Sequence, residues 1–338
     1  MNALEPILKH VRRLEPEALL HLPPSFPPVA IEIDRADLRL VRIRPQKRER
    51  PAIEAFHVLS APEDAAAASI LKPGGGAGAE LAKRLRDLFL QTGTKPGRVS
   101  LVLPDNLAKV SIVTLPEKPR TRKQLLELLR FKLRRSVPFR LEDAVLTASL
   151  LPGPGPEVGV LVAVMLRSVV EPYEAACEAA GGRPGLVDLC TPSLFNLLRR
   201  DLVAASAAGG DAALLNCTRG YFTLILVREG QVVFFRCKSY AGGDEAGRPE
   251  PLSVMARELA SSLSYYQEKL SGAGIGTVFV RALDPGLDEV APMLQRIGFG
   301  AVRAVEPAGL LAASTRLGPD DFLRAAPALG AAAGRTAA

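Results

Sequence analysis

Short apolar runs separated by polar turns predict strands in the first part of the chain. Two runs, Val29–Ile33 and Leu38–Ile43, stand on either side of a short polar turn, and a third follows at Ile53–Leu59. Runs of this length and spacing are typical of strands joined by hairpins. Many proteins place a strand, a polar turn and a strand under the phosphates of ATP, so this hairpin is the first candidate site.

Helical and strand-like patterns then alternate up to about residue 204. Residues 79–91 place Leu81, Leu85 and Leu88 on one helical face, and this spacing predicts an amphipathic helix. The predicted helices are Ala79–Gln91, Lys123–Val137, Val169–Ala180 and Pro192–Ala204. The predicted strands are Val99–Pro104, Lys109–Leu115, Val145–Leu151, Val158–Leu166 and Gly185–Leu189.

The second half of the chain repeats the opening arrangement after the small-residue stretch 204–212, which is the best predicted domain boundary. Three predicted strands form a meander, and Gly230 stands where its second hairpin needs a positive φ. These strands are Ala213–Cys217, Phe222–Val227 and Gln231–Arg236. The segments that follow are helix Pro251–Leu270, strand Thr277–Leu283, helix Asp288–Ile297, strand Ala301–Val305 and helix Asp320–Gly334.

Composition narrows the class of protein. The 338 residues are 48% hydrophobic and 23% charged, which is ordinary for a soluble globular chain. No apolar run approaches the roughly 20 residues of a membrane span. Glu5, Glu15 and Glu17 interrupt the N-terminal region, which therefore lacks the apolar core of a secretory signal and predicts a cytoplasmic protein.

Cysteine and histidine give no sign of a metal site or a catalytic centre. The four cysteines form no CxxC pair, and the three histidines lie near the N-terminus without ligand spacing. Adjacent acids such as Glu142 and Asp143 lie in a predicted turn, where capping or solvation explains them better than acid–base catalysis. We therefore predict no catalytic residue and no metal ligand.

A family resemblance is carried by SIVTLPEKPRTRKQLLELLRFKLRRSVPFRLEDAVL, residues 111–146. This segment resembles the signature of PilM, the cytoplasmic actin-like protein of the type IV pilus inner-membrane platform. The matching residues near its end are Val137, Pro138, Phe139, Leu141, Glu142 and Asp143. Further similar pieces follow in order, and the resemblance spans roughly residues 28 to 334. The cytoplasmic domain of the type II secretion protein GspL is similar in plan.

The resemblance implies an α/β fold of the duplicated actin-like (ribonuclease H-like) kind with a small inserted subdomain. In the second half, only residues 239–251 stand where the family has a lid subdomain, so the lid is expected to be reduced or absent. The expected divisions are an N-terminal helical, Pro-rich extension at 1–28, a first domain at 29–197 with the insertion at about 107–151, a second domain at 198–317, and a C-terminal helix and tail at 318–338.

The resemblance also identifies the positions where a relative would bind nucleotide. In the first hairpin Glu32 stands at the acidic position and Asp34 at the glycine position, where a carboxylate would repel phosphate. The other altered positions are Asn216, Thr218, Arg281 and Ala282. We therefore expect a degenerate site, a pseudo-ATPase and no cofactor. The alternative is a switch of the same fold that still binds ATP and Mg²⁺.

A basic run surrounds the predicted helix 123–137, in which Phe131 is the only aromatic residue. Eight Lys and Arg residues lie between positions 118 and 135, with Glu117 and Glu127 as the acids. Three interpretations stay open, namely a solvated helix face, a surface for an anionic membrane or acidic partner, and a nucleic-acid site. The absence of interleaved stacking aromatics weighs against nucleic acid, which we do not expect as a partner.

By resemblance, the partner is the cytoplasmic tail of a PilN-type membrane protein, bound between the inserted subdomain and the first domain. The candidate partner-binding residues are Lys109, Val110, Ile112, Arg130, Phe131, Arg134 and Phe139. The expected function is a scaffold that links this tail to other pilus or secretion components, including the motor. It would be a cytoplasmic protein, peripheral at the inner face of the inner membrane and held there through its partners.

Overall fold

The computed structural model describes residues 26–44, 50–62, 65, 70, 78–151, 157–240, 250–306, 309–312 and 317–334. The helix predicted within residues 1–28 therefore lies almost wholly outside the described residues. Most of the connection at 239–251 does so too, because residues 241–249 are not described. Within the described ranges, no helix is both long enough and apolar enough to cross a membrane.

The first sheet has five strands in the order β3-β2-β1-β4-β8. Strands β1, β2 and β3 form an antiparallel meander, and β4 and β8 are added parallel to β1. The strands are β1 Val29–Ile33, β2 Asp37–Arg44, β3 Ala52–Ser60, β4 Arg98–Leu103 and β8 Arg183–Leu189. The predicted opening hairpin is therefore correct to within about one residue at each end.

The second sheet repeats this plan in the order β11-β10-β9-β12-β13. Its first three strands are again an antiparallel meander, followed by two parallel strands. The strands are β9 Asp211–Thr218, β10 Tyr221–Arg228, β11 Gln231–Ser239, β12 Ile275–Ala282 and β13 Ala301–Ala304. Two sheets with the same strand order confirm the predicted duplication.

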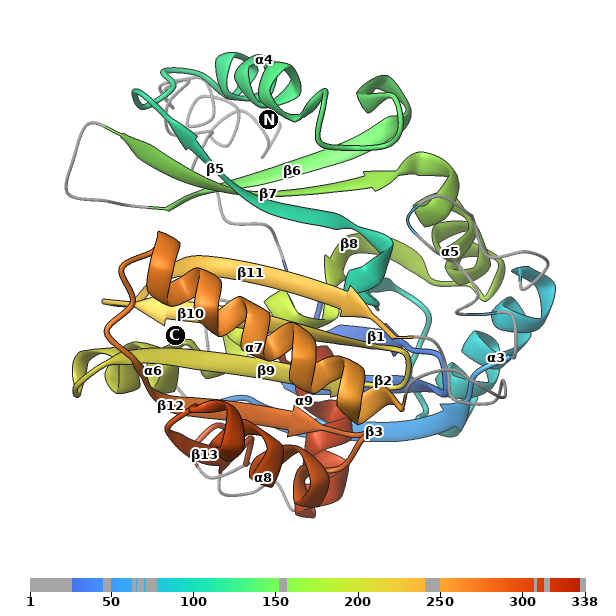
Figure 1. Cartoon of the computed structure of the whole chain (residues 1–338). Coiled ribbons are helices and arrows are strands. Elements are labelled where there is room, and N and C mark those ends of the chain that lie inside the picture. The colour runs from blue at the N-terminus through green and yellow to red at the C-terminus, as the bar shows by residue number, and fades with distance from the viewer. Residues whose placement is uncertain are drawn as a thin grey trace, which may run out of the picture.

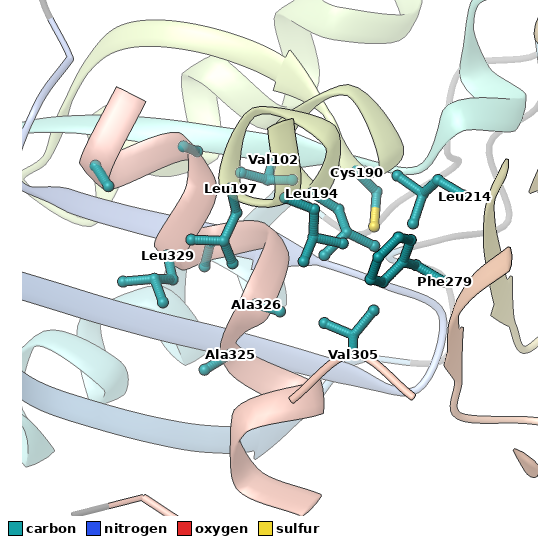
Figure 2. Packing of buried hydrophobic residues seen from close by; sticks show 14 of the residues in the cluster. Val102, Cys190, Leu194, Leu197, Leu214, Phe279, Val305, Ala325, Ala326 and Leu329 are labelled. Atoms are coloured by element: carbon teal, nitrogen blue, oxygen red, sulfur yellow. The ribbon is translucent and has the colours of Figure 1, made fainter. Parts of the chain in front are cut away.

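Two helices fill the space between the sheets. These are α6, Cys190–Ala207, and α9, Pro319–Ala333. Figure 2 shows Leu194 and Leu197 of α6 and Leu329 of α9 packed with Val102 of the first sheet and Phe279 of the second. Gly330 of α9 lies against the Ser193 carbonyl of α6, so the two helix backbones approach closely. One hydrophobic core therefore joins both halves of the molecule.

Each sheet is covered on its outer face by two further helices. Helices α3, Gly78–Gln91, and α5, Arg167–Ala179, pack on the first sheet through one apolar cluster. Helices α7, Pro251–Lys269, and α8, Leu287–Ile297, cover the second sheet in the same way (Figure 1). Because both faces of each sheet are covered, most positions along β1 and β9 are buried whether they point outward or inward.

The inserted subdomain is a three-stranded sheet with one covering helix. Its strand order is β5-β7-β6, with β5 Lys109–Leu115, β6 Ala144–Leu151 and β7 Val158–Leu166. Helix α4, Arg122–Leu133, packs on one face through Leu125, Leu129 and Leu133. Two short 3₁₀ turns, η1 Asp105–Leu107 and η2 Leu141–Asp143, precede β5 and β6. The subdomain includes β7, so it extends beyond the predicted end at about residue 151.

Two predicted helix ends are wrong for local reasons. Helix α4 ends at Leu133 and not at Val137, because Ser136 turns back onto the Leu133 carbonyl and Pro138 disfavours helical backbone at Val137. Helix α6 continues to Ala207, so the first residues of the predicted boundary 204–212 are helical. It stops where Gly209 and Gly210 adopt φ values of 129° and 119°.

Candidate functional site

The alternation of side chains along the strands brings charged positions of both sheets into the central layer. In β1, Glu32 points to the same face as Ala30, which packs against α6 and α9. In β12, Arg281 shares its face with Phe279, which packs in the same central core. Glu32 and Arg281 come from different halves of the chain, yet each faces the other across the domain interface.

Arg281 is the centre of this interface. Its side chain is fully buried, and Nη2 lies 3.1 Å from Glu32 Oε1. Nη1 donates to Asn216 Oδ1 at 3.0 Å, and Nε donates to the Leu323 carbonyl of α9 at 2.6 Å. The guanidinium therefore contacts β1, β9 and α9 at once. Two of the predicted nucleotide-site positions, Glu32 and Asn216, are therefore bound directly to a third, Arg281.

A second buried arginine completes the charge arrangement on the first hairpin. Arg39 stands directly opposite Glu32 in the β1–β2 pair, with Nη1 3.2 Å from Glu32 Oε1. The same nitrogen lies 3.3 Å from Asp34 Oδ2, and Nη2 lies 2.8 Å from Asp37 Oδ2. Asp34, which stands where a phosphate-binding relative needs glycine, is therefore held by the protein's own cation.

Burial and neighbouring charges shift the pKa values of these groups in opposite directions. Burial raises the pKa of Asp34, and the Arg39 guanidinium opposes this rise. Burial alone would lower the pKa of Arg281, but the Glu32 carboxylate more than compensates and keeps the pKa above its ordinary value. Both buried arginines are therefore cations, because each has a carboxylate within 3.3 Å.

A chain of hydrogen bonds continues from Arg281 to the start of the inserted subdomain. Asn216 Nδ2 donates to Thr191 Oγ1 at 2.8 Å, and the Thr191 hydroxyl and backbone N–H both bond to Asp105. Thr223 Oγ1 of β10 donates to Asp105 Oδ2 at 2.8 Å. Burial raises the pKa of Asp105 to about 6, although its threonine donors act to lower it. This carboxyl thus joins η1, α6 and the second sheet.

The two remaining predicted positions do not join this cluster. Thr218 Oγ1 donates to the Tyr221 carbonyl at 3.3 Å across its own hairpin. Ala282 is buried in the cluster that faces α7 and α8, on the opposite side of the second sheet from Arg281. The structure therefore brings Glu32, Asp34, Asn216 and Arg281 together and places Thr218 and Ala282 elsewhere.

The opening above the cluster is small. A hollow of about 220 Å³, part of it open to solvent, lies between the two hairpin turns. It is lined by Asp34, Arg35, Pro104, Asn106, Arg219, Gly220 and Tyr221. Gly220 has φ 101°, and a Cβ there would lie 2.9 Å from Arg35 Nη1. The Arg35 side chain of the first hairpin thus rests on the turn of the second hairpin and fills part of this opening.

The predicted partner-binding residues lie on two different sides of the inserted sheet. Val110 and Ile112 share one face of β5 and pack toward the cores of the main body. Arg130, Phe131 and Arg134 are exposed on α4, which covers the opposite face of that sheet. Lys109 is exposed at the start of β5, and Phe139 is half-buried against the subdomain core. The structure does not bring these seven residues onto one surface.

Sequence reasoning missed several members of the buried cluster, namely Arg39, Asp105, Thr191, Thr223 and Cys190, whose thiol donates to Glu32 Oε1 at 3.4 Å. One available signal was a charged residue inside an apolar strand, because Arg39 stands between Leu38 and Leu40. A strand covered on both faces must bury such a residue, and a buried charge needs a partner. No local pattern marks Asp105 or Thr191, whose roles depend on contacts 86 residues apart in the sequence.

Comparison with known proteins supports the fold. No protein-family profile and no curated protein match the sequence. One chain of the "PilM-PilN type IV pilus biogenesis complex" is similar in structure, with a TM-score of 0.73 and 19% identity, over 93% of this chain and 98% of its own.

Two other solved structures are less similar. The cytoplasmic domain of EpsL, an inner-membrane component of the Vibrio cholerae type II secretion system, gives a TM-score of 0.49, 11% identity and coverage of 90% and 93%. A Bacteroides thetaiotaomicron protein with actin-like ATPase fold gives a TM-score of 0.48 and 8% identity, over 88% of this chain and 95% of its own. The chain therefore has the same fold as that chain of the PilM-PilN complex.

Proposed function

We propose that this protein is a scaffold of a type IV pilus or related secretion assembly platform. It holds the cytoplasmic tail of a PilN-type inner-membrane protein and is placed at the membrane through that partner. The likeness to a chain of the PilM-PilN complex supports this function. The mechanism is binding through protein surfaces, and no reaction is assigned to it.

The observation that carries the proposal is an incompletely covered apolar surface. The face of the β5-β7-β6 sheet opposite α4 includes Val110, Ile112, Leu151, Leu161 and Ala163. All five are half-buried, whereas Val160, Val162 and Val164 on the α4 side are buried. We call these five residues the inner face. An apolar peptide segment that packed there would complete their burial, at about 25 cal/mol per Å² of area removed from water.

The position of the inner face suits a partner tail. It is turned toward the main body, and Ile112 lies among residues that pack on the central core together with Phe235 of β11. Strand β5 is an edge strand whose described partner is β7 alone. Extended peptides commonly bind at such an edge, where backbone groups and alternating side chains both contribute. A tail lying between the inserted subdomain and the body would touch both.

The buried cluster supports a role without nucleotide chemistry. The carboxylate of Glu32, which would serve a metal shell in a nucleotide-binding relative, is bound to Arg281 and Arg39. Phosphate binding would require two buried ion pairs to be rearranged, which is costly in a low-dielectric interior. We therefore propose a pseudo-ATPase with no cofactor.

The proposal is tested by titrating the full chain with a synthetic tail peptide of a PilN-type protein encoded beside it. Isothermal calorimetry should show saturable binding that falls at least about tenfold in Ile112→Asp or Leu161→Asp, because a carboxylate on the inner face opposes apolar contact. Leu90→Asp is the matched control, since Leu90 is 73% exposed on the distant helix α3. Unchanged affinity in variants that still melt cooperatively, or no binding by the natural chain, would contradict the proposal.

A further inference from the structure

The positive charge of this protein is concentrated around α4. Residues 117–135 carry eight basic and two acidic side chains, a net charge of +6, against +7 for the whole chain. The other 319 residues are therefore nearly neutral in sum. Such a local excess is a signature of attraction to an anionic surface. It lies on the part of the molecule farthest from the two main sheets in the view of Figure 1.

These cations are exposed and are not neutralised within the fold. None of the eight forms an ion pair with a carboxylate in the described part of the chain, and seven of them make no side-chain hydrogen bond there either. They are Lys118, Arg120, Arg122, Lys123, Arg130, Arg134 and Arg135, which we call the α4 basic face. The eighth, Lys132, donates to the Thr114 carbonyl at 2.8 Å. By contrast, Arg39, Arg228 and Arg236 each contact a carboxylate within 3.0 Å.

An exposed aromatic side chain lies inside the α4 basic face. Phe131 is 83% exposed, although Leu129 and Leu133 on either side of it are buried against the sheet. Arg130 and Lys132 flank it, and Arg134 follows almost one turn later. An apolar ring surrounded by long basic side chains is the arrangement that places a helix in the headgroup region of a bilayer.

We infer that the outer face of α4 binds directly to anionic phospholipid headgroups, with Phe131 inserted at the level of the glycerol backbone. The surface is a helix that stands out from its sheet, so it is convex and fits a flat bilayer better than it fits a peptide. Each Lys or Arg side chain near an anionic membrane contributes to the binding free energy, so a cluster of them binds more strongly than one alone. Nucleic acid is less suited, because Phe131 is the one aromatic residue in the basic segment.

This inference does not rest on the proposed partner. The inner face and the outer face of α4 lie on opposite sides of the β5-β7-β6 sheet. A protein that bound a tail on one side could therefore contact lipid on the other. Lipid binding would then orient the inserted subdomain toward the membrane, whichever protein the scaffold holds.

The test uses vesicle co-sedimentation of the purified full chain. Vesicles of phosphatidylcholine mixed with phosphatidylglycerol should bind the protein, vesicles of phosphatidylcholine alone should not, and added salt should release it. Arg130→Glu combined with Arg134→Glu should lower partitioning at least about tenfold. Ile112→Asp should leave partitioning unchanged, whereas the double charge reversal should leave tail-peptide affinity unchanged.

The absence of tryptophan from the chain gives a second readout. Phe131→Trp introduces a single indole whose emission should shift to shorter wavelength when anionic vesicles are added. Leu90→Trp, at a similarly exposed site on α3, should show no shift. Equal binding to neutral and anionic vesicles, or binding unaffected by the double charge reversal, would overturn the inference. An absence of vesicle binding would also overturn it. If the protein instead bound RNA or an acidic peptide, and the double charge reversal abolished that binding, the α4 basic face would serve a different partner and the inference would be wrong.

Discussion

Two buried arginines decide the chemistry at the domain interface. Arg281 joins β1, β9 and α9, and Arg39 holds the carboxylates of Glu32, Asp34 and Asp37. A buried ion pair contributes little net stability when it is compared with apolar packing, but removal of one partner leaves an unpaired charge in a low-dielectric site. The arginines are therefore best understood as residues whose loss the interface tolerates poorly.

Arg281→Met should destabilise the protein by about 3 kcal/mol, because it removes a partner of the buried Glu32 carboxylate and leaves Asn216 Oδ1 without its donor. Urea denaturation followed by circular dichroism measures the change in the free energy of unfolding. Arg303→Met is the matched control, since Arg303 is exposed on the adjacent strand β13. If Arg281→Met lowered the free energy of unfolding no more than Arg303→Met does, loss of the buried ion pair would have no special energetic cost.

Asp105 gives the interface a dependence on pH. Its pKa rises from 3.8 to about 6 in the folded protein, so the native state binds a proton that the unfolded state has lost. The resulting stabilisation is fully present below about pH 4 and is lost as the pH rises to about 6, by roughly 3 kcal/mol. Other groups titrate in the same range, so the comparison of variants is what isolates this contribution.

Asp105→Asn should flatten the pH dependence of the free energy of unfolding between about pH 4 and 6. The amide keeps the shape of the carboxyl, and the Thr191 and Thr223 hydroxyls can reverse their hydrogen bonds to accept from it. Urea midpoints measured across this range test the prediction. Parallel curves for the natural chain and the variant would mean that Asp105 does not titrate there.

At the scale of elements, the packing of α6 on α9 determines how the halves are joined. Gly330 lets the two helix backbones approach at Ser193, although glycine is a poor helix former. Close approach is what allows Leu197 and Leu329 to fill the space between the sheets (Figure 2). For the stability of the protein, the close contact between the two helix backbones at Gly330 outweighs the low helix propensity of glycine.

Gly330→Ala should therefore destabilise the protein by about 2 kcal/mol, even though alanine is intrinsically better in a helix. The added methyl group would overlap the Ser193 carbonyl and lie 3.4 Å from Leu197 Cβ. Gly78→Ala, in the first turn of α3, is the control and should be neutral or stabilising, because no described residue outside that turn lies within 4 Å of the new Cβ. Thermal melting compares the two. Equal melting temperatures would contradict the predicted overlap.

At the scale of the whole molecule, the two halves are joined by charge, hydrogen bonds and a shared apolar core. The Glu32–Arg281 pair links residues 249 apart in the sequence, and Arg35 rests on Gly220 across the opening. In this arrangement the protein supplies its own cation at the interface. We therefore expect the two halves to stay joined when no nucleotide is bound.

Addition of Mg²⁺ and ATP should leave the melting temperature unchanged and give no saturable heat in calorimetry. A ligand that binds the native state at 100 times its dissociation constant would stabilise it by about 2.7 kcal/mol, which is easily measured. Binding in the low-micromolar range would instead support the alternative of an ATP-binding switch. Such binding would also require the Arg281–Glu32 ion pair to break, so Arg281→Met should then strengthen ATP binding.

The apolar and polar pattern of the sequence determined most of the elements and the duplicated plan. Val29–Ile33 and Lys109–Leu115 appear as predicted, because runs bounded by turn residues depend mainly on local chemistry. The family resemblance, and not this pattern, indicated that Glu32, Asp34, Asn216 and Arg281 are unusual. Only the tertiary structure decided that they contact one another, because they meet through strand order and face, which local spacing does not encode.

The tertiary structure also divided the predicted partner residues. Arg130 and Ile112 lie within 20 residues of each other in the sequence, yet α4 and the inner face stand on opposite sides of a three-stranded sheet. Chain proximity determines which residues share an element, whereas packing determines which elements share a surface. The sequence thus determined the fold and predicted a degenerate nucleotide site, and the packing decided which of those positions contact one another and which side chains stay on the surface.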